Sequence, residues 1–420
     1  MRALRLAACV LVAACSNAPV GGGVVTLQFW GMGREGDVVA ELIPQFEREN
    51  PGIRVRVQQI PWTAAHEKLL TAHVGGATPD VAQLGNTWVA EFAAIRALEP
   101  LDSLVAGSTA AQPDAYFTGI WRTNLVGDTL YGVPWYVDTR LIFYRKDILA
   151  QAGYDSIPQD WAAFVAMMRV IKRNVGPDRF PILLPTNEWA QPVIFGQQNG
   201  ATLLRDGNMY GAFSSPAFRQ AFDFYVQMFR DGLAPVQGLY DVANPFQEFE
   251  RGYFAMWITG PWNIGEMKKR LSPAMRDKWA TAPLPGPRGA ASGLSTAGGA
   301  SLVMFRASER KAEAWKLIEF LSRTEQQVRF FELTGSLPAR QEAWQRARLK
   351  EDEYARAFWT QLQRVTPLPA VPEIESIVQR VAEHAETSIR GNTPTEQALR
   401  ALDSDVNRML EKRRFMAARN

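Results

Sequence analysis

The chain has 420 residues, and at roughly 150 residues per domain this length predicts two or three domains. Hydrophobic residues make up 47% and charged residues 21% of the chain, which is ordinary for a globular protein and excludes wholesale disorder. The net charge of +3 is too small to favour a nucleic-acid partner. With three histidines and two cysteines, thiol and imidazole ligands are scarce, so we expect no metal site and no cofactor.

The N-terminus has the pattern of an export signal. Residues 1–14 combine a charged start, Arg2 and Arg5, with an apolar run too short to span a bilayer as a mature helix. The run ends in Leu-Val-Ala-Ala-Cys, which resembles the lipobox of bacterial lipoproteins and predicts cleavage before Cys15 and lipidation of that cysteine. The alternative is an ordinary signal with a chance cysteine. Loss of Cys9 with the signal leaves one cysteine, which excludes an intramolecular disulfide, and residues 15–23 are expected to be a flexible tether.

The body of the chain opens with a strand, a helix and a strand at 24–30, 37–49 and 53–60, which predicts a parallel sheet covered by helices. A serine cap, Pro216 and Gly232 predict a strong helix at 216–231. The other expected elements are, in chain order, helix 64–74, strand 80–84, helix 88–97, strands 130–134 and 141–145, helix 161–174, strand 253–258, a loop at 284–298, strand 300–305, helices 308–321 and 325–333, and an almost wholly helical stretch from 340 onward.

A glycine-rich segment near the start imitates a nucleotide-binding motif. Gly31, Gly33 and Gly36 fit the G-x-G-x-x-G pattern between a strand and a helix. The second strand, however, ends in Gln-Gln-Ile rather than in the acidic residue that would bind a ribose, and the bulky Trp30 stands where the strand meets the loop. We therefore interpret the segment as a loop that exposes Trp30 and a helix N-terminus at a ligand cleft.

Motifs of known catalytic sites are missing from the sequence. G-x-S-x-G, H-E-x-x-H and Walker A patterns do not occur. Carboxylates are plentiful, so counting alone leaves a glycosidase pair open, although none has a local reason for a raised pKa. We expect a protein that is not an enzyme.

Several segments resemble one protein family and occur in the family's order. They are Thr-Pro-Asp-Val-Ala-Gln-Leu at 78–84, Gly-Val-Pro-Trp-Tyr-Val-Asp at 132–138 with Leu-Ile-Phe-Tyr-Arg-Lys-Asp at 141–147, a segment at 252–262 ending in Gly-Pro-Trp, Gly-Gly-Ala-Ser-Leu-Val at 298–303, and Gly-Ser-Leu-Pro-Ala-Arg at 335–340. Together with the lipobox they span nearly the whole chain. They resemble extracellular solute-binding proteins of the maltose/trehalose-binding type, the sugar receptors of ATP-binding-cassette importers.

The resemblance implies an α/β periplasmic-binding-protein fold with two lobes, three interlobe crossings and a ligand cleft between the lobes. The N-terminal lobe is expected at 24–134 plus 283–335 and the C-terminal lobe at 135–282 plus 336–420. Arg340, after the third crossing, is expected to brace the hinge. The lobes are expected to close on the ligand by a hinge motion.

Some candidate ligand-binding residues come from their place in the predicted elements. A sugar has apolar ring faces and a rim of hydroxyls, which aromatic and polar side chains can bind. Alternation in an extended segment puts Tyr136 and Asp138 on one face. Asn86 and Trp88 follow a strand at its carboxyl end, where α/β sheets bind ligands.

Other candidates come mainly from the resemblance. It places Trp262 in the cleft as a stacking platform, and it places Trp189 and Arg380 where the family contributes cleft residues. The acidic residue before the first helix is either Glu35 or Asp37. The remaining candidates are Trp30 and Glu35 in the first loop, Trp257, for which core packing is the alternative, the turn at Gly260, and the backbone N–H of Gly299.

The expected function is a receptor that delivers a sugar, first of all a disaccharide such as trehalose or maltose, to the membrane permease subunits of an importer. The protein is expected to be a monomer that a lipid anchor holds on the periplasmic or extracellular face of a membrane. The alternatives are a receptor for a glycerol-phosphate-type solute, a secreted lipid-anchored glycosidase, and a signalling sensor with the same fold.

Overall fold

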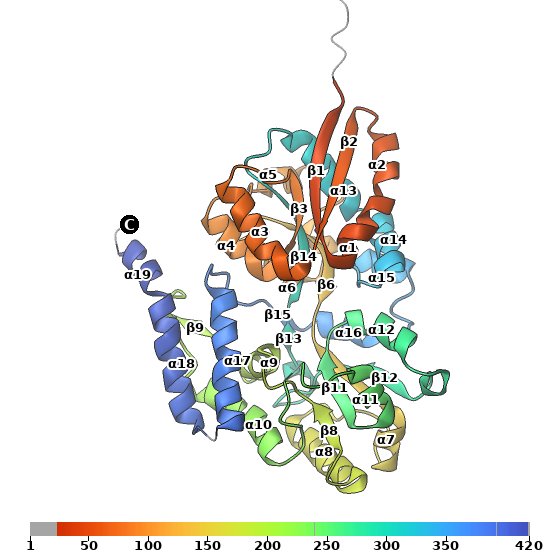
Figure 1. The fold of residues 1–420 in the computed structure, drawn as a ribbon, viewed down its shortest axis with the longest axis vertical. Coiled ribbons are helices and arrows are strands. Elements are labelled where there is room, and N and C mark those ends of the chain that lie inside the picture. The colour runs from red at the N-terminus through yellow and green to blue at the C-terminus, as the bar shows by residue number, and fades with distance from the viewer. Residues whose placement is uncertain (1–22, 239, 392, 419–420) are drawn as a thin grey trace, which may run out of the picture.

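Two β-sheets, one in each of two lobes, organise the chain, as Figure 1 shows for the computed structural model. The structure describes residues 23–238, 240–391 and 393–418. The predicted signal peptide, Cys15 and the tether up to residue 22 lie outside the described residues. Among the helices in the described part of the chain, none has the length and apolar character needed to cross a membrane.

The sheet of the first lobe is mixed. Parallel pairing joins β1 to β2 and to β3, whereas β14 runs antiparallel to both β3 and β6. Leu27 and Phe29 of β1 are fully buried, which explains why this segment forms an inner strand. In the described residues the strand order is β2 (Ile53–Ile60), β1 (Val25–Met32), β3 (Val81–Gly85), β14 (Gly298–Met304) and β6 (Val133–Asp138).

Short helices surround this first sheet (Figure 1). The predicted helix at 37–49 is divided, because Pro44 lacks the backbone N–H that a continuous helix needs and stands in the first turn of a new helix. Close packing of Gly36 on Gly31 brings the first helix onto β1 and explains these glycines without a nucleotide. The helices of this lobe are α1 (Gly33–Val38), α2 (Ile43–Glu49), α3 (Trp62–Val74), α4 (Val89–Ala94), α5 (Asp102–Ala106), α6 (Thr118–Arg122), α13 (Lys311–Ser322), α14 (Thr324–Thr334) and α15 (Gln341–Arg346).

The second lobe has a smaller sheet. Its described strands follow the order β12 (Trp279–Ala282), β7 (Leu141–Arg145), β11 (Phe254–Thr259) and β8 (Phe180–Leu183). All six residues of β11 are buried, because helices cover both faces of this central strand.

Outside the two main sheets, two-residue strands of the described residues form three further pairs. They are β4 (Leu125–Val126) with β5 (Thr129–Leu130), β9 (Leu204–Arg205) with β10 (Tyr210–Gly211), and β13 (Ser295–Thr296) with β15 (Val365–Thr366).

The helices of the second lobe include the strongly amphipathic ones. The predicted helix at 216–231 is confirmed as α10: Ser215 caps its N-terminus by accepting from the N–H of Phe218, and Phe222 and Tyr225 are buried. The stretch after 340 is largely helical, as predicted. The helices are α7 (Lys146–Gln151), α8 (Trp161–Val175), α9 (Ala190–Gln198), α10 (Pro216–Arg230), α11 (Pro245–Arg251), α12 (Trp262–Arg270), α16 (Arg356–Leu362), α17 (Ile374–Arg390), α18 (Thr395–Met409) and α19 (Glu411–Ala417).

The first passage between the lobes follows β6. That strand pairs with β14 as far as Asp138, so the expected boundary at 134 falls inside β6, and β7 of the other sheet begins at Leu141. Thr139 Oγ1 donates to the carbonyl of Thr296 at 2.9 Å, and Ser295 Oγ donates to the carbonyl of Arg140 at 2.8 Å. The first and second passages of the chain are therefore fastened to each other.

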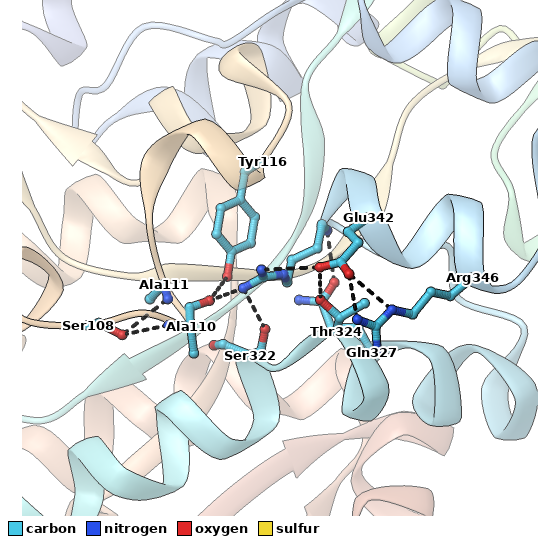
Figure 2. Close-up of polar contacts among 10 residues, drawn as sticks. Ser108, Ala110, Ala111, Tyr116, Ser322, Thr324, Gln327, Glu342 and Arg346 are labelled. Carbon is cyan, nitrogen blue, oxygen red and sulfur yellow. Dashed lines mark hydrogen bonds and ion pairs between the residues drawn. The ribbon is translucent and has the colours of Figure 1, made fainter.

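Arg340 lies in a network that fastens the third passage to the first lobe, and Figure 2 labels its partners Ala110, Ser322 and Gln327. Its side chain donates to the carbonyls of Ala110 and Ser322, and its guanidinium lies 5.9 Å from the ring centroid of Tyr116. Its backbone N–H donates to Gln327 Oε1 at 2.9 Å. The segment around Arg340 thus still packs on the first lobe, whereas the resemblance placed residues 336–420 in the C-terminal lobe.

Candidate ligand-binding cleft between the lobes

A cavity of about 490 Å³ lies between the two lobes and is lined by residues of both. Most predicted candidates line it: Glu35, Asn86, Trp88, Tyr136, Asp138, Trp189, Trp262 and Gly299. Glu35, rather than Asp37, faces the cavity, and its Oε1 accepts from Ser336 Oγ at 3.2 Å. We call this space the central cavity.

The hydroxyl of Tyr136 accepts one hydrogen bond and donates none to the residues that the structure describes. Gln83 Nε2 donates to the Tyr136 hydroxyl oxygen at 3.0 Å, and Gln83 Oε1 accepts from the N–H of Met32 at 2.7 Å. Burial raises the pKa of Tyr136 well above its ordinary value, and the charges of Glu35 and Asp138 add to that effect. The hydroxyl therefore stays protonated, and since it accepts from Gln83 its own proton is available to a ligand oxygen.

Arg140 links groups from both sides of the cavity. Its Nη1 donates to Asp138 Oδ1 at 2.5 Å, and its Nε donates to Glu188 Oε1 at 3.3 Å. Its guanidinium carbon lies 4.6 Å from the ring centroid of Trp262, within the range of a cation–π contact. Burial alone would lower the pKa of the Arg140 guanidinium. The negative charges of Asp138 and Glu188 have the larger combined effect and raise this pKa above its ordinary value.

Burial raises the pKa of Asp138, and the neighbouring Arg140 offsets part of this effect. Asp138 keeps acceptor capacity beyond its bond to Arg140, because a carboxylate has about four lone-pair positions. It can accept from a ligand hydroxyl while it stays paired.

Tryptophans stand on both walls. On the first lobe, Trp62 and Trp88 meet edge to face with ring centroids 5.7 Å apart, and the imidazole of His66 packs on Trp88. On the second lobe, Trp189 and Trp262 line the cavity. Trp262 begins α12 and is 46% exposed, an unusual exposure for so large an apolar side chain. The cavity therefore offers flat apolar surfaces on opposite sides.

Two glycines bring the backbone of β14 against β6. A Cβ on Gly298 would lie 2.5 Å from the carbonyl oxygen of Asp138, and a Cβ on Gly299 would lie 2.2 Å from that of Tyr136. Gly299 also has φ +137°, which disfavours residues with a side chain. These glycines make the floor of the cavity from backbone.

Four predicted candidates lie outside the cavity lining. Trp30 packs at the edge of a first-lobe core cluster under the ammonium of Lys68, and Trp257 is 4% exposed in β11. Gly260 lies beneath the ring of Trp262, where a Cβ would clash with that ring. Arg380 lies on the exposed side of α17 and pairs with Glu383. Core packing and surface pairing explain these positions.

Several lining residues were missed from the sequence. Trp62 follows Pro61 at the carboxyl end of β2, so the rule that selected Asn86 could have found it. Arg140 and Ser336 stand inside or beside the family-like segments. Leu368 carries no local signal, because only the return of the chain after residue 362 brings it to the cavity. Glu375 lies on the same helix as Arg380, where the resemblance predicted a cleft residue, but Arg380 was chosen instead. No group of three or more His, Cys, Asp or Glu side chains in the described ranges is placed to hold a metal ion.

Comparisons with known proteins agree with this geometry. The sequence model of the bacterial extracellular solute-binding protein family matches residues 32–328. The structure of the sugar-binding protein MalE from the phytopathogen Xanthomonas citri is 49% identical, has a TM-score of 0.91 and covers 94% of this chain and 100% of that chain.

More distant relatives match over most of their length. The diacetylchitobiose binding protein DasA of Streptomyces coelicolor is 24% identical over 400 residues, covering 92% of this chain and 90% of that protein. The galactooligosaccharide-binding protein of Bacillus subtilis is 23% identical over 390 residues, covering 89% and 86%.

Proposed function

Because the chain belongs to the bacterial extracellular solute-binding protein family, we propose that it is the receptor that delivers a sugar to an ATP-binding-cassette importer. Similarity to the sugar-binding MalE of Xanthomonas citri over 94% of the chain supports sugar as the ligand class. Within that class we propose a disaccharide such as maltose or trehalose.

The observation that carries this proposal is the chemistry of the two walls. Exposed tryptophans stand on both, and Tyr136, Asp138 and Glu35 supply hydrogen-bonding groups between them. Flat rings pack on the C–H faces of a sugar, while the polar groups bind its hydroxyls. A volume of about 490 Å³ lies within the range of about 300–1,000 Å³ that is typical of small-molecule sites.

A glycerol-phosphate-type solute fits this lining less well. Arg140 is the only Lys or Arg among the described lining residues, and it is already paired with Asp138 and Glu188. Glu35 and Glu375 add further negative charge. A phosphate bound here would face carboxylates without a free cation, so its binding would be unfavourable.

We propose that the protein has no catalytic activity. Of the carboxylates that line the central cavity, Asp138 is paired with Arg140 and Glu35 accepts from Ser336 Oγ, so neither is set up as the acid or the base of a glycosidase. Incubation with disaccharides separates the two functions, because a glycosidase releases products and a receptor returns its sugar unchanged.

We also propose that Cys15 carries the lipid anchor and that the receptor acts on the periplasmic or extracellular face of the membrane. A lipoprotein of Streptomyces antibioticus is 30% identical to this chain over 186 residues, and this similarity supports the proposed lipid anchor. Replacement Cys15→Ser should move the protein from the membrane fraction to the soluble fraction, or leave the precursor uncleaved. Processing and anchoring as before would contradict the anchor.

A thermal-shift screen tests the function. The purified protein is heated with maltose, trehalose, other disaccharides, polyols and glycerol phosphate. A ligand at 100-fold its Kd should stabilise the folded state by about 2.7 kcal/mol. Stabilisation by a disaccharide and not by glycerol phosphate is expected. Stabilisation by glycerol phosphate alone would contradict the proposed ligand class.

A further inference from the structure

Two tryptophans of the first lobe, Trp62 and Trp88, form one aromatic surface on the central cavity. Their ring centroids lie 5.7 Å apart and their planes meet at 64°, which is an edge-to-face contact. A Cβ on Gly85, at the end of β3, would lie 3.5 Å from the ring of Trp88 and 3.8 Å from the ring of Trp62. Both indoles therefore lie over this strand end. We call the two residues the tryptophan pair.

His66 joins the tryptophan pair to the core of the first lobe. It stands four residues after Trp62 on α3, which places both side chains on one face of that helix. Its imidazole centroid lies 5.0 Å from the ring of Trp88 and 5.9 Å from the ring of Phe92, edge to face in both cases. Phe92 is fully buried in a core cluster. Because His66 does not itself line the central cavity, it can affect a ligand only through its neighbours.

A hydrogen bond fixes the orientation of this imidazole. His66 Nε2 lies 2.6 Å from Glu91 Oε2, and because a carboxylate only accepts, Nε2 carries the proton that is donated. Glu91 and Phe92 follow Trp88 by three and four residues, a spacing that puts the three side chains on one side of η2 (Asn86–Trp88) and α4. The side chain of His66 is 31% exposed, and without this bond its ring would be free to turn.

An aromatic surface that is already ordered binds more tightly, because the ligand does not have to immobilise it. On the second lobe, the guanidinium of Arg140 lies 4.6 Å from the ring centroid of Trp262 and holds that ring. His66 stands in the same relation to Trp88 on the first lobe. We propose that His66 is a positioning residue, which holds the tryptophan pair in the orientation that packs on the sugar. This inference rests on the proposed function, because it concerns groups that contact the sugar.

Calorimetric titration with maltose and with trehalose tests this role. His66→Ala removes the ring and the bond to Glu91, so it should weaken binding by about threefold to tenfold, the size of one lost aromatic contact. His66→Phe keeps a flat ring against Trp88 and should restore most of the loss. His73→Ala is the matched control. His73 lies about three turns beyond Trp62 on the same helix, with its Nε2 3.2 Å from the carbonyl of Ile95, and its loss should leave binding unchanged.

Circular dichroism separates positioning from a general loss of stability. Two indoles in edge-to-face contact give a coupled band in the far ultraviolet, and the difference between the wild type and Trp88→Phe isolates the band of the tryptophan pair. His66→Ala should weaken this band at a temperature where the variant is fully folded, whereas His73→Ala should keep it.

The two measurements must change together. A wild-type affinity in His66→Ala would overturn the role of His66 while leaving the proposed function intact. A weaker affinity with an unchanged band would also overturn it, because His66 would then act by some means other than the orientation of the tryptophan pair. Failure of the wild type to bind any sugar would overturn the proposed function and this role with it.

Discussion

Two arginines near the passages between the lobes, Arg340 and Arg140, have similarly low side-chain exposure, 11% and 17%, but different surroundings. Arg340 donates to backbone carbonyls of Ala110 and Ser322 that belong to the packed interior of the first lobe (Figure 2). Arg140 contacts Asp138 and Trp262, which both line the central cavity. Low exposure and ion pairing therefore do not tell a structural arginine from a ligand-binding one. What distinguishes Arg140 is that its partners line the central cavity, whereas those of Arg340 are packed inside the first lobe.

The largest expected effect is the loss of folding stability when Arg340 is replaced. Arg340→Met should lower the free energy of unfolding by about 2–5 kcal/mol, because the backbone carbonyls of Ala110 and Ser322 lose their donor. Urea unfolding measures the loss. Sugar affinity, measured by calorimetry well below the unfolding midpoint, should change little. A loss below about 1 kcal/mol would contradict the role of Arg340 as a brace.

Replacement of Trp262, in contrast, should weaken sugar binding and leave folding stability almost unchanged. Trp262→Ala removes an exposed platform and should weaken sugar binding by about 2–4 kcal/mol, with little change in stability. Trp257→Ala is the matched control: this buried tryptophan should cost stability and leave the central cavity lining unchanged. Unchanged calorimetric affinity of Trp262→Ala for a sugar that binds the wild type would contradict the platform.

Tyr116, beside Arg340, predicts a dependence of stability on pH. Burial raises its pKa to about 12, although Arg340 opposes the shift, whereas the unfolded residue ionises near 10. Its contribution is fully present below pH 10 and is lost as the pH rises from about 10 to 12, by up to about 2.7 kcal/mol. Unfolding of the wild type and of Tyr116→Phe across this range isolates the effect. The same slope in both proteins would argue against a buried, protonated Tyr116.

The smallest effect is expected at Tyr136. Tyr136→Phe removes one donor to the ligand and leaves Gln83 Nε2 without its acceptor, so sugar affinity should fall by about 0.5–1.5 kcal/mol. Tyr144→Phe, on β7 outside the central cavity lining, is the control and should bind normally. An equal loss in both variants would show that the effect is not local to the cavity.

Much of the fold could be predicted from local signals. The strand–helix–strand opening, the helix at 216–231 and the α/β class are confirmed, because hydrophobic periodicity, caps and breakers act over short distances. The brace expected of Arg340 is consistent with its contacts, although no sequence pattern could name Ala110 or Ser322 as its partners. Those partners are brought together only by the tertiary fold.

The site was predictable where side chains follow strand ends. Asn86 and Trp88 line the central cavity for that reason, whereas Tyr136 and Asp138 were found because alternation along an extended segment puts them on one face. Trp257 shows the limit of the approach, because alternation along β11 cannot tell a cavity-facing tryptophan from a core one when helices cover both faces. Leu368 was not predictable, since it reaches the cavity through a late return of the chain.

We propose that both lobes hold one sugar in the central cavity and close on it. Moving such a hinge from 1:99 to 99:1 in favour of the closed form takes about 5.5 kcal/mol of differential binding, which a micromolar ligand with about 8.2 kcal/mol in total can supply. Small-angle scattering of the wild type, with and without a saturating sugar found in the thermal-shift screen, measures closure directly. We predict a smaller radius of gyration with the sugar bound. An unchanged radius at saturation would contradict a two-walled site that closes on its ligand.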